Sequence, residues 1–310
     1  MANLTYRSQT NGGDNTLSVN NINATLPTGT VAGDMQSIWV SCAVLSPGSP
    51  PAMNTPAGWV KQGASGSISF GGGAINGQLT LFTKIADGSD GTVNLATSGG
   101  TNAALAFIRK SYQNPDAANL CAQVSFIGAT GGPDTSPVVT GLTTGANNAM
   151  IDIVLTQGVA QSATPPGSMT ERADNTTYAI SCADEIIATA GATGTRTFTL
   201  PSSSDYLWGI AEFRSAPGQI TVQPTSQSSY EGQTATFSIT ANPTGTPSYQ
   251  WKDDGASVGT NSNSYTTAAA VFSDNLSQIT CEVTDDNGTG VSNAATWAVF
   301  MAAKPFYLRA

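Results

Sequence analysis

Histidine is absent from the 310-residue sequence, and charged residues make up only 10% of it. Without imidazole, the chain cannot build Ser-His-Asp or Cys-His nucleophilic sites, histidine-ligated metal centres or the usual proton shuttle near neutral pH. No apolar run is long enough to span a bilayer. We therefore expect no catalytic residue, no metal, no cofactor and no insertion into a membrane.

Cysteine is also scarce, with four residues whose spacing matches no zinc or redox motif. Three of them, Cys42, Cys182 and Cys281, lie inside apolar runs typical of strands. A cysteine in such a run behaves as a small hydrophobic residue. We expect buried thiols and no disulfide, as in proteins that fold in a reducing compartment.

Basic residues are few, since 11 Lys and Arg face 20 Asp and Glu, for a net charge of −9. Phosphate backbones and anionic membrane surfaces repel a chain of this charge, so nucleic acid is not an expected partner. Residues 1–7 show no basic segment followed by an apolar one, the pattern of a signal peptide. We expect synthesis in a cytoplasm and no export by a cleaved signal.

Hydrophobic residues reach 39% of the chain and alternate with polar ones, which predicts strands. Turn-forming stretches rich in Gly and Pro separate the alternating segments. No amphipathic helical pattern of useful length is present. The sequence therefore predicts an all-β protein. In the first 215 residues the expected strands cover 38–44, 79–85, 105–107, 151–155, 178–182 and 206–210.

The same region shows an internal sequence similarity with a period of roughly 110 residues, which is too long for a solenoid repeat. The paired segments are 33–35 with 147–150, 55–59 with 164–169, and Phe107-Ile108-Arg109 with Glu212-Phe213-Arg214. We predict that residues 1–216 form a jelly-roll-like β-sandwich with two related halves. Two small sandwiches packed together remain an alternative.

Residues 30–214 resemble a loosely defined domain that is common in bacteriophage and bacterial surface proteins. The resemblance rests on the Gly-Asp start of a strand, the two Thr-Pro turns, Leu79–Lys84 and Ala190–Thr195. These motifs are mainly those of turns and strands, so their specificity is low. The resemblance implies a surface-display domain.

Ser215–Gly218 has the composition of a linker, and residues 219–300 resemble an immunoglobulin-like domain. Glu231–Ile239 resembles its strand B, Tyr249–Trp251 its strand C with the core tryptophan, and Ile279–Val283 its strand F. The sequence Asp286-Asn287-Gly288 is typical of a hairpin turn. The resemblance implies a core containing Phe237, Ile239, Trp251 and Cys281.

One departure from the family pattern is informative. Ile239 occupies the position of the first core cysteine of the family, so Cys281 has no partner for the inter-sheet disulfide. An apolar contact between Ile239 and Cys281 would fill the space instead. This pattern fits the immunoglobulin-like domains of bacteria and phages, and counts against an antibody or an animal receptor.

A few aromatic and basic residues are candidates for contacts with a subunit or a glycan. Trp39 lies on the opposite side of its strand from Ile38 and Val40, and Trp59 follows a Pro-Ala-Gly turn. A core role is the alternative for both. The tail, residues 301–310, is apolar and contains Phe306, Tyr307 and Arg309, which we expect to dock on a neighbouring subunit or on the protein itself.

Paired carboxylates are the best enzymatic option in a chain without histidine. Asp184 and Glu185 are adjacent, so their side chains point to opposite faces of a strand and cannot flank one bond. Carboxylates distant in sequence could still meet in the fold.

Together these features favour a non-enzymatic structural protein of a bacteriophage virion, a capsid decoration or a fibre-like appendage, assembled in the bacterial cytoplasm. Expected partners are other virion proteins, further copies of the chain as a homo-oligomer, and a host-surface glycan. The alternatives are a bacterial cell-surface adhesin or carbohydrate-binding module, and a tail-associated polysaccharide depolymerase. The sequence leaves open whether the protein lies on the capsid or the tail, and which domain anchors it.

Overall fold

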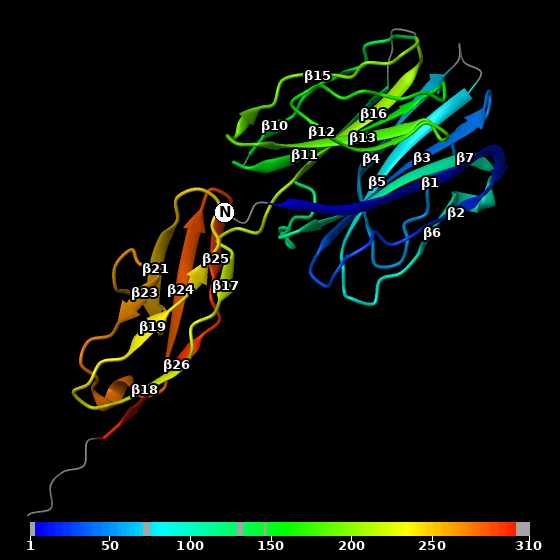
Figure 1. The fold of residues 1–310 in the computed structure, drawn as a ribbon. Coiled ribbons are helices and arrows are strands. Elements are labelled where there is room, and N and C mark those ends of the chain that lie inside the picture. Colours follow the sequence, from blue (N-terminus) through cyan, green and yellow to red (C-terminus); the bar gives the residue numbers. More distant parts are fainter. Residues whose placement is uncertain (1–3, 71–74, 129–132, 146, 302–310) are drawn as a thin grey trace, which may run out of the picture. The chain divides into compact units, whose positions relative to one another are not determined.

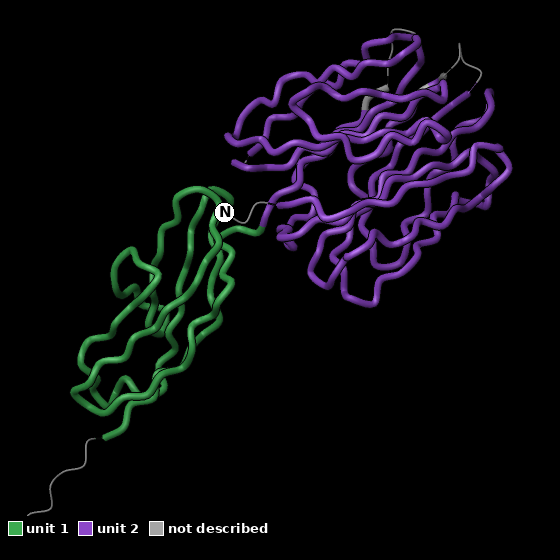
Figure 2. Tube along the Cα trace, viewed as in Figure 1, with its two compact units in different colours: residues 1–2, 216–310 green, residues 3–215 purple. Residues whose placement is uncertain are grey.

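The computed structural model describes residues 4–70, 75–128, 133–145 and 147–301, which are nearly all in strands and loops (Figure 1). The predicted all-β class is confirmed. The chain divides after Ser215 into two compact units, the N-terminal and C-terminal domains (Figure 2). Within the described residues, no helix has the length and apolar character needed to cross a bilayer.

The N-terminal domain is a β-sandwich of two five-stranded antiparallel sheets. The first sheet has the order β1-β7-β3-β5-β4, and the second has the order β8-β16-β11-β13-β12. The strands of the first sheet are β1 (Thr5–Val19), β3 (Met35–Leu45), β4 (Val60–Phe70), β5 (Ile75–Ile85) and β7 (Ala103–Gln113). Those of the second are β8 (Gln123–Gly128), β11 (Ala149–Gln157), β12 (Thr170–Asn175), β13 (Ile180–Ile187) and β16 (Tyr206–Phe213).

Short strand pairs accompany each main sheet, and two of these pairs contribute side chains to the clusters on the outer faces. One pair belongs to the first half and two pairs to the second. They are β2 (Asn21–Ala24) with β6 (Val93–Ala96), β9 (Val138–Val139) with β15 (Arg196–Thr197), and β10 (Thr143–Thr144) with β14 (Gly191–Ala192). A short 3-10 turn, η2 (Ser98–Gly100), precedes β7.

The two halves therefore share one pairing order, and each supplies one complete sheet of the sandwich. No strand of one half joins the main sheet of the other within the described residues. Met35 pairs with Tyr112 in the first half, as Met150 pairs with Phe213 in the second. This register makes Tyr112 the counterpart of Phe213. The predicted match of Phe107-Ile108-Arg109 with Glu212-Phe213-Arg214 is wrong by four residues, because both segments carry similar apolar and basic residues.

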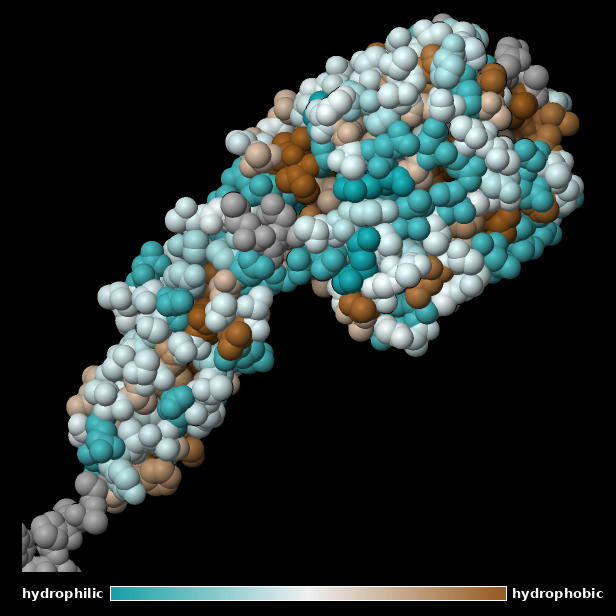
Figure 3. Space-filling model, viewed as in Figure 1, coloured by the Kyte–Doolittle hydropathy of each residue, from teal (hydrophilic) through white to brown (hydrophobic). Residues whose placement is uncertain are grey.

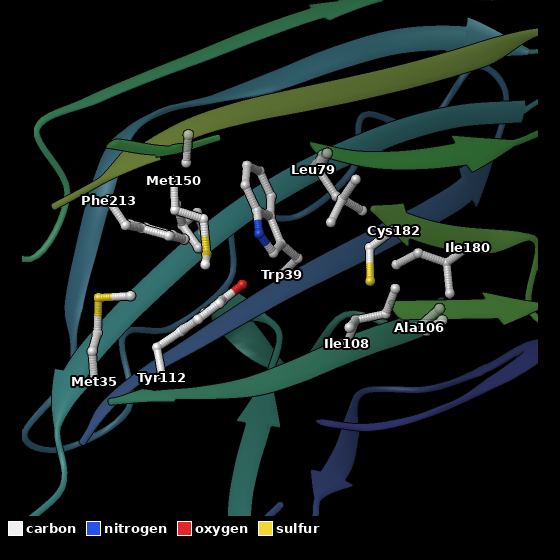
Figure 4. Close-up of a cluster of buried hydrophobic side chains, with 14 of the residues drawn as sticks. Met35, Trp39, Leu79, Ala106, Ile108, Tyr112, Met150, Ile180, Cys182 and Phe213 are labelled. Atoms are coloured by element: carbon white, nitrogen blue, oxygen red, sulfur yellow. The ribbon is translucent and has the colours of Figure 1, made fainter. Parts of the chain in front are cut away.

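Three buried clusters hold the N-terminal domain together. The first lies between the sheets and contains Trp39, Leu79, Ile108, Met150 and Phe213 (Figure 4). The second and third lie on the outer faces of the two sheets, with side chains from the short strand pairs. The central strands are thus buried on both faces, which explains why β11 and β16 have no exposed residue.

The C-terminal domain is also a β-sandwich, in which β18 (Gln227–Tyr230) and β26 (Ala295–Phe300) pair in parallel. Its largest sheet has the order β18-β26-β24-β21-β22, with β25 paired to β24. The remaining elements are β17 (Ile220–Val222), β19 (Thr236–Ser238), β20 (Thr240–Ala241), β21 (Ser248–Asp253), β22 (Ala256–Val258), β23 (Ser264–Thr266), η3 (Phe272–Asp274), β24 (Ser277–Asp285) and β25 (Gly288–Val291).

The four residues expected in the core of this domain lie in one buried cluster. Phe237, Ile239, Trp251 and Cys281 are each at most 3% exposed. The indole nitrogen of Trp251 donates a hydrogen bond to the carbonyl oxygen of Ser262 at 2.9 Å. Packing of these side chains stabilises the domain without a crosslink, since the Cys281 thiol is unbridged.

All four cysteines are unbridged thiols, and burial raises their pKa values. In the N-terminal domain, burial raises the pKa of Cys42, Cys121 and Cys182 to about 12. Unfolded cysteine ionises near pH 8.5 to 9. Above that pH the unfolded chain therefore holds fewer protons than the folded one, and the stability of the domain falls as pH rises.

We expect the N-terminal domain to lose about 4 kcal/mol of unfolding free energy through these three thiols at pH 10, about 1.4 kcal/mol for each. Urea unfolding at pH 8 and pH 10 measures the loss. A variant with Cys42, Cys121 and Cys182 replaced by alanine should show a clearly smaller change between the two pH values. An equal change in both proteins would contradict the role of the thiols.

Candidate functional site

Trp39 and Trp59 are not surface residues, so the predicted contact role is wrong for both. Trp39 is 0% exposed between the two sheets, and its indole nitrogen donates a hydrogen bond to Asp152 Oδ2 at 2.8 Å. Trp59 is 7% exposed in the second cluster, where the Arg109 guanidinium lies 5.4 Å from its ring centroid. Both sheet faces of this domain are covered, so a tryptophan on either face is buried.

A buried polar network lies among the apolar side chains between the sheets. Asp152 in β11 forms an ion pair with Lys110 in β7, and both side chains are 0% exposed. Although burial alone lowers the pKa of Lys110, the Asp152 carboxylate beside it raises that pKa above its usual value. The pair joins the two sheets, because each sheet supplies one partner.

Asp184 in β13 lies directly opposite Asp152 in the sheet, so carboxylates distant in sequence do meet in this fold. Arg172 in β12 donates from Nε to both oxygens of Asp184, at 2.9 and 2.8 Å. The same guanidinium lies 4.1 Å from the ring centroid of Tyr6. Burial raises the pKa of Asp184, while the hydrogen bonds from Arg172 oppose this rise.

Four carboxylates of the N-terminal domain, Asp152, Asp184, Glu185 and Glu212, each form an ion pair with a basic side chain. Glu185 points to the opposite face from Asp184, as predicted from the strand, and pairs with Arg196. Glu212 pairs with Arg214 at 2.8 Å. A glycosidic acid or base must reach its substrate, whereas Asp152, Asp184 and Glu212 are at most 2% exposed at their side chains. These contacts make the carboxylates part of the packing of the domain.

Exposed apolar side chains gather at one end of the C-terminal domain. The strands β18 and β26 lie side by side at this end of the domain (Figure 1). Their last residues, Tyr230 and Phe300, are 54% and 53% exposed, with ring centroids 5.9 Å apart. Together with the neighbouring exposed side chains they form a surface that we call the apolar tip. Its members are Tyr230, Val271, Phe272, Leu276, Phe300 and Met301.

Hydrogen bonds hold the segments of the apolar tip together. The backbone nitrogen of Glu231 donates to the carbonyl oxygen of Phe300 at 2.9 Å, and that of Phe272 to Glu231 Oε1 at 3.2 Å. The backbone nitrogen of Leu276 donates to the carbonyl oxygen of Trp297 at 2.8 Å. The segments that carry the side chains of the apolar tip are therefore connected to one another by hydrogen bonds.

The chain enters this domain far from the apolar tip. Gly218 packs against the backbone of Val283 and Gly290, near the end of β24 that lies away from Leu276. The tip thus lies at the end of the domain opposite to its covalent link. Elsewhere, the face in Figure 3 shows apolar side chains only in small patches between polar ones.

The tail candidates Phe306, Tyr307 and Arg309 lie outside the described residues. Sequence reasoning singled out the apolar tail, residues 301–310, which begins next to Phe300, but it missed Tyr230 and Leu276. Nothing in the local pattern distinguishes these two from core residues. It also missed Lys110 and Asp152, for which a signal existed, because each is a charge within an apolar strand segment.

Comparisons with known proteins yield no family model and no curated relative that matches this chain. Among solved structures, the fibronectin(III)-like modules of Clostridium thermocellum CbhA are similar at 13% identity, with a TM-score of 0.25, covering 61% of this chain and 100% of that one. The N-terminal Ig1-2 module of the Drosophila receptor protein tyrosine phosphatase DLAR is similar at 14% identity, with a TM-score of 0.25, covering 54% and 100%. At such low TM-scores these likenesses carry no argument about function.

Proposed function

We propose that the protein is a non-enzymatic structural component of a bacteriophage virion, a capsid decoration or a fibre-like appendage that contacts other proteins through the apolar tip. The apolar tip is the observation that supports a role in contacts with other proteins. Exposed apolar side chains clustered at one place, with two aromatic rings among them, are typical of protein interfaces. The virion setting rests on the resemblance of both domains to phage and bacterial surface domains.

The internal chemistry of the domains supports a structural role. Carboxylates that could serve acid-base chemistry are instead paired with Lys110, Arg172, Arg196 and Arg214. Both domains are stabilised by packing of unbridged thiols and apolar side chains. Such domains fold in a reducing cytoplasm, where virions assemble, and many copies on a particle would convert weak contacts into avidity.

Changing Phe300 and Tyr230 to aspartate should release the protein from particles. Two charges at the centre of the tip should weaken the contact by at least about 2 kcal/mol, roughly a 30-fold loss of affinity. Gradient fractionation of a phage lysate separates the particle band from unassembled protein and measures the bound fraction.

Val291→Asp is the matched control, because Val291 is 60% exposed in the same domain but lies outside the tip. This variant should stay with the particles, as should the wild type. Thermal unfolding of the tip variant should remain close to that of the wild type, since the substituted side chains are half exposed. A wild-type protein that never enters the particle band would contradict the proposed function. A tip variant that enters the band normally would contradict the role of the tip.

A further inference from the structure

A cavity of about 260 Å³ opens between the two main sheets of the N-terminal domain, next to Ala106. Figure 4 shows Ala106 at one end of the buried cluster, beside Ile180. The walls come from β1, β3, β5, β7, β11, the loop after β11, and the turn between β12 and β13. The cavity is thus bounded by both halves of the domain.

Small side chains leave this space open. Along β3, the residues facing the other sheet change from Trp39 to Ser41 and Ala43, and along β7 they change from Ile108 to Ala106 and Ala104. Large side chains fill the interior elsewhere, and protein interiors are normally close-packed. The gap between the sheets is therefore specific to this end of the sandwich.

Hydroxyl groups lie at the inner part of the cavity. Ser41 Oγ and Thr156 Oγ1 form a hydrogen bond of 3.1 Å between the two sheets, and both residues are buried. A hydroxyl can donate one hydrogen bond and accept two, so each retains capacity for a ligand. At the rim, Asn15 Nδ2 donates to the carbonyl oxygen of Thr177 at 3.3 Å, which connects β1 with the turn before β13.

We infer that this cavity binds one neutral sugar ring, with the apolar face of the ring against the alanines and its hydroxyls toward Ser41, Thr156 and the rim. Its volume exceeds the roughly 150 Å³ that accommodates a benzene ring, and lies just below the range of about 300 Å³ upward for drug-sized ligands. A single substituted six-membered ring matches this size. This inference goes beyond the proposed function and does not depend on it.

Charge around the cavity favours a neutral ligand over an acidic one. Among the described residues that line it, Asp14 is charged and none is basic. The hydroxyl and backbone N–H of Thr16 donate to Asp14 Oδ1 and lower the pKa of Asp14, so that carboxylate is ionised at neutral pH. An anionic sugar would meet this charge without a compensating cation.

The backbone at the rim is also unusual. Leu17 has φ of 57° and Ala179 has φ of 50°, a left-handed conformation that residues other than glycine rarely adopt. Such residues often lie at binding sites, where the surrounding structure holds them in place. Both residues line the cavity, which supports a site whose shape is fixed before the ligand binds.

Ligand-observed NMR and calorimetry on the full chain test the inference with the methyl glycosides of glucose, galactose and N-acetylglucosamine. We expect saturable binding of at least one of them, with a dissociation constant on the order of 1 mM. Ala43→Leu, which fills the cavity, should weaken that binding by about tenfold or more. Ala118→Leu is the matched control at an exposed position and should bind as the wild type does.

Each other outcome contradicts the inference. No saturable binding of any of the three glycosides would do so, as would binding of cyclohexanol as an apolar probe with no sugar binding. Binding that Ala43→Leu leaves unchanged would place the ligand elsewhere. Should Ala43→Leu fail to fold, Ser41→Ala replaces it, and it must weaken sugar binding while leaving the unfolding temperature near that of the wild type.

Discussion

Replacing Lys110 with methionine should destabilise the N-terminal domain by about 3–5 kcal/mol. The substitution leaves the Asp152 carboxylate 0% exposed without the cation that pairs with it, while the indole N–H of Trp39 still donates to it and Asp184 lies opposite it in the sheet. A carboxylate that loses its buried partner pays the cost of desolvation without the compensating attraction. Urea unfolding of the full chain, followed by calorimetry to separate the two domains, measures the loss.

A double variant makes this prediction sharper. Lys110→Met with Asp152→Leu removes both charges and should recover most of the lost stability, because apolar groups often replace a buried ion pair at little cost. Lys61→Met removes a partly exposed lysine of the same domain and should change stability by no more than about 0.5 kcal/mol. A Lys110→Met loss as small as that of Lys61→Met would show that the pair is not buried as described.

The second large effect is expected at Gly209, where alanine should destabilise the N-terminal domain by about 2–3 kcal/mol or more. A Cβ atom at this position would lie 2.3 Å from Trp39 Cζ3 and 3.0 Å from Leu79 Cδ2. Neither neighbour can move freely, since Trp39 is fully buried and hydrogen-bonded to Asp152. The same unfolding measurement reports the loss.

Two comparisons isolate the contact with Trp39. In a Trp39→Leu background, Gly209→Ala should cost much less, because residues in contact show non-additive effects. Gly167→Ala is the control, since nothing lies within 4 Å of its added Cβ atom. Equal costs of Gly209→Ala in both backgrounds would contradict a direct clash.

Trp39 and Gly209 also show how the two related halves of the N-terminal domain differ. By register, Trp39 corresponds to Val154, and Gly209 corresponds to Ile108. Where the first half has a tryptophan facing inward, the second half supplies a glycine that makes room for it. The sequence showed the repeat, but the repeat alone could not reveal that a large residue in one half faces a missing side chain in the other.

The central strands of the N-terminal domain were predictable, and the edge strands were not. All six predicted segments coincide with strands or overlap them, namely β3, β5, β7, β11, β13 and β16, the three inner strands of each sheet. Within the two main sheets, the strands missed are β1, β4, β8 and β12, which are the four sheet edges. An edge strand pairs on one side only and carries polar residues and glycine, as in β1, so it lacks the apolar alternation on which the prediction rests.

The candidate site was harder to predict than the fold. Trp39 was a surface candidate because it faces away from Ile38 and Val40 and an antiparallel sheet commonly has one face in water, and Trp59 because it follows a Pro-Ala-Gly turn. Here the short strand pairs accompany the outer faces of both sheets, and such pairs leave little trace in sequence. The apolar tip depends on segments near residues 230, 272 and 300, which only the folded domain brings together.

Quantitative mass spectrometry of purified virions, with labelled peptides of both domains as standards, tests the central claim most directly. The account predicts several copies per particle, in a number that stays constant between preparations and through repeated gradient purification. Fewer than one copy per particle, or a number that falls with each purification step, would contradict a structural role in the virion.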